Sequence, residues 1–179
     1  MSSRRPSTGF TAATAVTVFL VSFALIALQL FYMRALSVTR NYHFSYLVIS
    51  TALLGFGVSG TFLTFAFEKL ARRFEVWSYR FLFFFSLSIP LSYSLSRLLP
   101  IDIRYIFYSG GQFALLLLYN LLLFLPFFFG AVCIGLSLSY FKRQIPVLYG
   151  VNLFGSGIGA WVPWRYSTSC LRHCCPSRQ

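Results

Sequence analysis

The feature that most constrains this chain is a series of long apolar runs that hold almost no charge. The first extends from Thr11 to Tyr32 without a charged side chain. Runs of about 18 or more apolar residues with few charges are typical of membrane-spanning helices. Of the 179 residues, 58% are hydrophobic and 10% are charged, whereas a soluble domain has about 25% charged residues. The chain has too few polar residues to cover the surface of a soluble globular protein. The sequence therefore predicts an integral membrane protein.

The runs predict an all-α fold, a polytopic helical bundle with four transmembrane helices and the start of a fifth. The predicted transmembrane domain is 11–164, and its spans are 11–33, 44–67, 80–99, 113–139 and a partial span at 149–164. The first run is too long for the core of a signal peptide and lacks a small-residue cleavage site, so we expect a retained helix. In the fourth run, Pro126 predicts a bend.

The cations lie between the apolar runs and predict the topology. The net charge is +12, from 15 Lys and Arg against three acids. One side of the predicted bundle holds Arg4, Arg5, Lys69, Arg72, Arg73, Arg80, Lys142 and Arg143, and the other holds Arg34, Arg40, Arg97 and Arg104. The positive-inside rule therefore predicts that residues 1–10 are cytoplasmic and that the chain is multi-pass in the inner or plasma membrane. Cations spread in this way do not form the single patch expected for nucleic-acid binding.

Two glycine-rich stretches resemble nucleotide-binding motifs. "GFGVSG", from Gly55 to Gly60, has the spacing of a dinucleotide fingerprint, and "VNLFGSGIG", ending at Gly159, resembles the first motif of S-adenosylmethionine-dependent enzymes. The fingerprint needs a strand, a turn and a helix, and an apolar run has no room for them. Small residues let membrane helices approach closely. The predicted helix-packing residues are Gly55, Ser59, Gly60, Gly155 and Gly159.

Polar residues inside the predicted spans are candidates for a functional cavity, because burying them in lipid is costly. Ser88, Ser92 and Ser96 recur at helical spacing and share one face. The candidate lining is Gln29, Ser88, Ser92, Ser96 and Asn120. The alternative is that these groups form interhelical hydrogen bonds or replace the one freed by Pro90. No arrangement of acids, nucleophiles or bases supports catalysis, so we expect no enzyme activity, no cofactor and no metal.

Four stretches carry a family resemblance. "LQLFYMRALSV", "YHFSYLVISTALLGFGVSG", "LLFLPFFFGAVCIGLSLS" and "LYGVNLFGSGIGA" resemble, in that order, the transmembrane part of membrane-integral spermidine-synthase-like proteins, over residues 12–160. The resemblance implies a membrane domain related to major-facilitator transporters, with a soluble aminopropyltransferase-like domain as a partner. Asn152 stands where that family usually has an acid, which weakens a proton- or cation-linked role.

The last residues depart from this pattern. After Ala160 the chain continues as "WVPWRYSTSCLRHCCPSRQ". Because it holds Arg165, Arg172 and Arg178 with Pro163 and Pro176, we expect the helix to end abruptly near Pro163, leaving an atypical polar tail at 165–179. An out-of-frame or truncated product is favoured, and a genuine short tail or a metal site remain alternatives. The metal ligands would be Cys170, His173, Cys174 and Cys175.

Two functions follow as expectations. The first is a truncated, transporter-like membrane domain of a spermidine-synthase-like protein, without catalysis of its own. The alternative is a self-contained small membrane protein that acts as an anchor or a helix-packing subunit. Its partners would be the lipid bilayer and other membrane helices.

Overall fold

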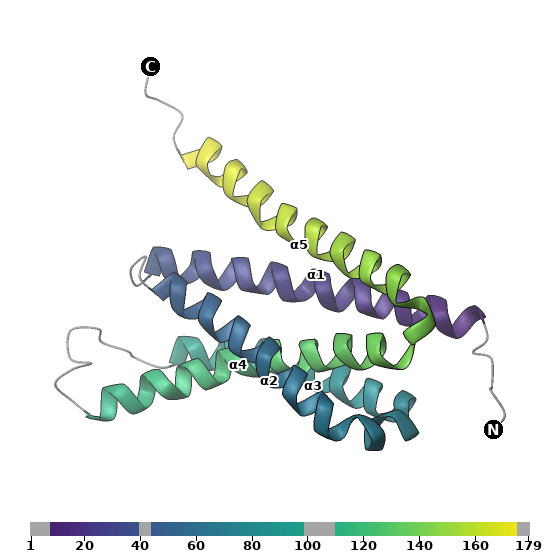
Figure 1. Ribbon diagram of the computed structural model, residues 1–179. Helices are drawn as coiled ribbons and strands as arrows, with labels where there is room; N and C mark the ends of the chain where they lie inside the picture. Colours follow the sequence, from purple (N-terminus) through teal and green to yellow (C-terminus); the bar gives the residue numbers. More distant parts are fainter. Residues whose placement is uncertain (1–7, 40–43, 99–109, 175–179) are drawn as a thin grey trace. The chain divides into compact units, whose positions relative to one another are not determined.

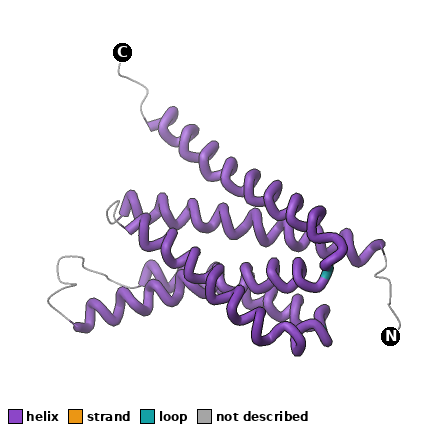
Figure 2. Tube along the Cα trace, viewed as in Figure 1, coloured by secondary structure: helices purple, strands orange, loops and turns teal. Residues whose placement is uncertain are grey.

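The computed structural model describes residues 8–39, 44–98 and 110–174, and all of their regular structure is helical (Figures 1 and 2). The elements are α1 (Thr8–Thr39), α2 (Phe44–Arg72), α3 (Phe74–Leu98), α4 (Gly110–Tyr140), the short 3-10 helix η2 (Lys142–Gln144) and α5 (Ile145–Cys174). The prediction of an all-α helical bundle is confirmed.

Four of the described helices are long and apolar enough to cross a membrane, which supports a multi-pass membrane protein. The candidate spans are Ala12–Arg34, Tyr46–Arg72, Ala114–Tyr140 and Lys142–Val162. The last of these is a full-length segment of 21 residues, where the sequence predicts only the start of a span. The third helix, α3, is not among the four.

Three prolines of the described residues, Pro90, Pro126 and Pro163, lie inside helices without ending them. Pro90 lies inside α3 and Pro126 inside α4. In the same way α5 continues past Pro163 to Cys174, so the expectation that the helix ends near Pro163 is wrong. A proline removes one backbone hydrogen bond, and membrane helices tolerate this because neighbouring groups satisfy the freed carbonyl.

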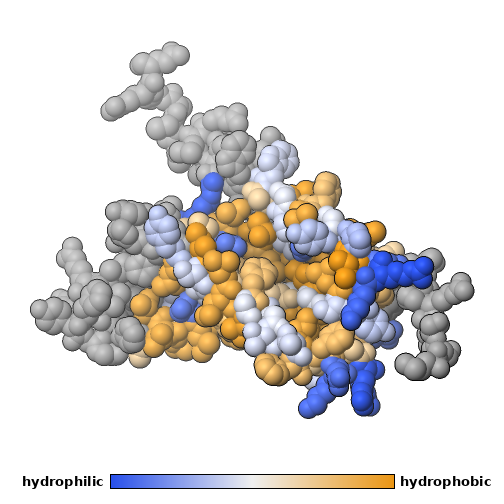
Figure 3. Space-filling view, viewed as in Figure 1, coloured by the Kyte–Doolittle hydropathy of each residue, from blue (hydrophilic) through white to orange (hydrophobic). Residues whose placement is uncertain are grey.

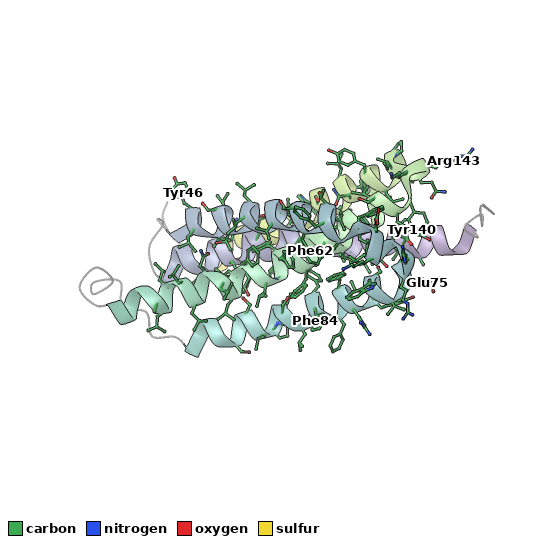
Figure 4. The ribbon with its side chains drawn as sticks, turned by 60° about the horizontal axis from the view of Figure 1, so that its bottom comes forward. Tyr46, Phe62, Glu75, Phe84, Tyr140 and Arg143 are labelled. Atoms are coloured by element: carbon green, nitrogen blue, oxygen red, sulfur yellow. The ribbon has the colours of Figure 1, made fainter. Side chains whose placement is uncertain are left out.

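The chain divides into two compact units, Met1–Phe31 with Ser137–Gln179, and Tyr32–Leu136. The second unit contains α2, α3 and most of α4. An aromatic cluster joins all three, because the Phe62 ring of α2 lies 6.4 Å from Phe81 of α3 and 5.7 Å from Phe128 of α4. In the same cluster Phe84 stacks on Phe129 at 5.4 Å. Figure 4 labels Phe62 and Phe84 among the side chains of these helices.

Contacts within this second unit fix the helix directions. Along α2, Gly55 contacts α4 at Phe127, and Leu63 contacts it further on at Gly135. Because the residue numbers of both helices increase from the first contact to the second, α2 and α4 run parallel. The chain between two parallel helices must reverse its direction, and α3 follows α2 after a turn at Arg73.

The first unit joins α1 to η2 and α5. Along α1, Phe19 contacts α5 at Gly155 and Phe23 contacts it at Gly159, so these two helices are also parallel. Figure 1 shows α5 alongside α1. The Phe19 and Phe154 rings lie 6.3 Å apart beside the glycine contacts. Helices α1 and α5 therefore meet along their backbones.

Candidate functional site

Helix α2 approaches α4 closely at Gly55, in the second unit. A Cβ atom added to Gly55 would lie 2.8 Å from the Cβ of Phe127 and 3.2 Å from the backbone nitrogen of Phe128. Real side chains essentially never make contacts this short, so this crossing requires a residue without a Cβ atom. The small-residue packing of membrane helices accounts for the glycine.

The first unit repeats this arrangement twice, between α5 and α1. A Cβ atom on Gly155 would lie 2.7 Å from the carbonyl oxygen of Phe19, and one on Gly159 would lie 2.6 Å from that of Phe23. Both glycines are buried. The spacing of Gly155 and Gly159 places them on one face of α5, as a G-x-x-x-G packing motif requires.

The other two predicted packing residues are placed differently. Ser59 is buried, and its hydroxyl donates a hydrogen bond to the Phe56 carbonyl of its own helix at 2.7 Å. Gly60 is exposed, and a Cβ atom there would meet nothing within 4 Å among the described residues. The structure therefore brings Gly55, but not Gly60, against a neighbouring helix.

Each glycine crossing is accompanied by a contact between a hydroxyl and an asparagine. In the second unit, Thr51 of α2 contacts the Asn120 side chain of α4. In the first unit, Ser22 of α1 contacts the Asn152 side chain of α5. Both contacts lie inside candidate spans, where an unpaired amide would be costly.

The hydroxyl in each pair also bonds its own helix. Thr51 donates to the Leu47 carbonyl, and Ser22 donates to the Val18 carbonyl, both at 2.7 Å. A hydroxyl has a single proton, which these carbonyls use, but its oxygen can still accept. The bonding is complete when the asparagine amide nitrogen donates to the hydroxyl, and an amide can be turned to meet this requirement. Each asparagine therefore joins two helices through a backbone-anchored hydroxyl.

The two glycine helices, α2 and α5, also share a sequence pattern. "LLGFGVSG" at 53–60 and "LFGSGIGA" at 153–160 align without a gap, with Leu53, Gly55 and Gly57 matching Leu153, Gly155 and Gly157. The first glycine of each pattern makes the close helix contact. The sequence analysis did not find Ser22 and Thr51, because neither lies in a glycine pattern.

The remaining candidate cavity residues have separate partners. Tyr32 of α1 donates to the Ser92 hydroxyl of α3 at 3.1 Å, and Ser88 donates to the Phe85 carbonyl of its own helix at 2.8 Å. Ser92 and Asn120 thus have different partners. Gln29 is partly buried on α1, and the side chain of Ser96 lies outside the described residues.

Several residues that the sequence analysis singled out lie outside the part of the chain that the structure describes. The side chains of Cys170, His173 and Cys174 lie outside the described residues, as do Cys175 and residues 1–7. Among the residues that are described, no group of three or more His, Cys, Asp or Glu side chains could hold a metal ion.

Comparisons with known proteins give no relative for this chain. No protein-family model matches it, no curated protein matches its sequence, and no solved structure matches its fold.

Proposed function

We propose that this chain is a transporter-like membrane domain of a spermidine-synthase-like protein and has no catalysis of its own. The observation that carries this proposal is the repeated helix pair, α2 with α4 and α5 with α1. Many transporter folds are built from internal structural repeats. The family resemblance over residues 12–160 supplies the spermidine-synthase-like part of the proposal.

The order of the helices supports a repeat of three. If α1–α3 form the first copy and α4 begins the second, then α1 matches α4 and α2 matches α5. The second helix of each copy then carries the glycine and contacts the first helix of the other copy. Such reciprocal contacts are expected of two repeats that pack against each other.

The asparagines are the groups that we propose to be functional. Asn120 and Asn152 each lie inside a candidate span and each contact a hydroxyl at a repeat crossing. Polar groups within the membrane are rare, and they mark substrate paths in transporters. We place the N-terminus in the cytoplasm of a cell with an inner or plasma membrane, from the asymmetry of the loop cations.

Flux through reconstituted vesicles tests the proposal. The full chain is placed in liposomes, and uptake of radiolabelled spermidine is compared with uptake by protein-free liposomes. We expect uptake above that background, and we expect the double variant Asn120→Leu with Asn152→Leu to lose most of it. A matched variant, Asn41→Leu, replaces the third asparagine of the chain and should keep full uptake. Uptake equal to the protein-free background would contradict a transport role.

A second candidate function is a helix-packing subunit or anchor within a membrane complex. The observation that favours it is a set of exposed glycines on α2 and α5, at which a Cβ atom would meet nothing within 4 Å. These residues are Gly57, Gly60, Gly150 and Gly157. Crosslinking in native membranes would distinguish the two functions. Under this alternative, Gly57→Leu with Gly60→Leu abolishes a crosslinked complex, and the chain shows no flux.

A further inference from the structure

The tip of the hairpin formed by α2 and α3 gathers four cations. Lys69 and Arg72 lie in the last turn of α2, Arg73 lies in the connecting turn, and Arg80 lies in α3. All four side chains are exposed. In Figure 3 a hydrophilic patch lies at the bottom of the view, over the hairpin tip that Figure 1 shows there. We call these four residues the hairpin cation cluster.

The turn that carries this cluster is flanked by buried residues and closed by backbone hydrogen bonds. Leu70 and Phe74, on either side of the turn, are buried at 4% and 5% exposure. The Arg73 N–H donates to the Leu70 carbonyl at 3.2 Å, and the Trp77 N–H donates to the Arg73 carbonyl at 3.1 Å. The cluster is therefore presented from a defined turn between two packed helices.

The acids that the structure describes do not pair with the cations of the cluster. Glu68 and Glu75 are its near neighbours in the sequence, and both are exposed. In the part of the chain that the structure describes, no carboxylate forms an ion pair with any of the four cations. Glu75 lies in the first turn of α3, where the helix dipole favours a negative charge. The guanidinium and ammonium donors remain available to an external anion.

The aromatic residues beside the cluster are of the kind found at the level of lipid headgroups. The Arg80 guanidinium lies 5.2 Å from the Trp77 ring centroid, a cation–π contact that holds this cation against an interfacial side chain. Arg73, Trp77 and Arg80 have the spacing of one helix face. Tryptophan is enriched at the membrane–water interface. Further along α3, Phe83 is 64% exposed, as a side chain in contact with acyl chains would be.

We infer that the hairpin cation cluster binds the headgroups of anionic phospholipids. Basic residues next to a membrane-spanning helix attract anionic lipids, and arginine pairs with phosphate through two parallel hydrogen bonds. The zwitterionic headgroup of phosphatidylcholine lacks the net negative charge that the cluster would neutralise. The inference needs only the hairpin tip and is independent of any transport activity.

Quenching of Trp77 fluorescence by brominated lipids tests this inference. The full chain has three tryptophans, and Trp161→Phe with Trp164→Phe leaves Trp77 as the only reporter. The protein is reconstituted in mixed vesicles that carry brominated phosphatidylglycerol or brominated phosphatidylcholine. We expect phosphatidylglycerol to associate about tenfold more strongly at Trp77, as attraction of several basic residues would give.

Charge variants identify the groups responsible. Arg72→Gln with Arg73→Gln removes two of the four cations and should lower the ratio of the two association constants, whereas Arg72→Lys with Arg73→Lys keeps the charge and should keep most of the preference. Glu75→Gln removes an acid and should raise the preference. Circular dichroism of each variant checks that its helix content is unchanged.

Two results would overturn the inference. One is equal quenching by the two lipids in the protein that retains all four cations. The other is an undiminished preference for phosphatidylglycerol in the Arg72→Gln, Arg73→Gln variant, which would assign the selectivity to another part of the chain.

Discussion

The carbonyl oxygen of Phe19 lies 2.7 Å from the position that a Cβ atom would occupy on Gly155, so α1 and α5 meet backbone to backbone. No other residue fits this contact without a shift of the helices. In lipid, close packing of this kind takes the place of the hydrophobic effect that holds soluble helices together. The packing of α1 against α5 therefore depends on the absence of a side chain at Gly155, as it does at Gly159.

The first prediction concerns this contact. Gly155→Ala should destabilise the folded protein by about 1–3 kcal/mol, the usual cost of overpacking. The free energy of unfolding in mixed micelles with increasing dodecyl sulfate measures the effect. Gly157→Ala is the matched control, because a Cβ atom there meets nothing within 4 Å. Equal stability of the two variants would contradict the backbone contact between α1 and α5.

The second prediction separates two glycines of α2 that the sequence cannot distinguish. Gly55→Ala should lower the free energy of unfolding by about 1–3 kcal/mol, because its Cβ would lie 2.8 Å from the Cβ of Phe127. Gly60→Ala should be neutral or slightly stabilising, since its surroundings are open and alanine favours a helix. The same micelle titration measures both, and a larger loss for Gly60→Ala would exclude the α2–α4 crossing at Gly55.

These two glycines illustrate how far the sequence could predict the structure. The apolar runs predict the helices well, because length and hydrophobicity alone decide whether a segment can cross a membrane. Which face of a helix meets a neighbour depends on tertiary packing, and Gly55 and Gly60 are equally small. For the same reason the partners of Asn120 and Asn152 could not be predicted, since periodicity does not say which helices touch.

The end of α5 shows a different reason for error. The sequence predicts an end near Trp164 because the composition changes abruptly there, with arginines and prolines in place of apolar residues. Pro163 lies beyond the candidate span Lys142–Val162, and a proline removes only one backbone hydrogen bond, so the helix can continue past it. The change in composition therefore marks the end of the candidate span but not the end of α5.

The third prediction concerns the paired asparagines. A double-mutant cycle with Thr51→Val and Asn120→Leu should give a coupling energy of about 0.6 kcal/mol, with about 1.7 kcal/mol as the upper range for membrane hydrogen bonds. A second cycle with Ser22→Ala and Asn152→Leu should give a similar value, because both pairs join a hydroxyl to an amide across parallel helices. Free energies of unfolding for the single and double variants supply both numbers. Additive effects in either cycle would show that the side chains of that pair do not interact.

The fourth prediction concerns the hydrogen bond between Tyr32 and Ser92. Tyr32→Phe removes only the hydroxyl, leaves Ser92 buried, and should lower the free energy of unfolding by about 0.5–1.5 kcal/mol. Ser92→Ala made in the Tyr32→Phe background should then cost less than it does in the unaltered chain. Ser88→Ala is the control, because its hydroxyl donates within its own helix and its effect should not depend on Tyr32.

The fifth prediction uses Cys133 to follow the second unit alone. Cys133 is 1% exposed on α4, close in sequence to Gly135, whose Cβ position lies 3.1 Å from the Leu63 side chain of α2. With Cys170, Cys174 and Cys175 replaced by serine, a maleimide should modify Cys133 only when this unit opens locally.

Gly55→Ala should speed that modification about tenfold, since about 1.4 kcal/mol of lost stability corresponds to a tenfold rise in the open population. Gly155→Ala alters the contact of α5 with α1, so the rate at Cys133 should change much less. Mass spectrometry of samples quenched at successive times gives both rates. If Gly155→Ala speeds the modification as much as Gly55→Ala does, the two units open together, and the independence of the two helix pairs is excluded.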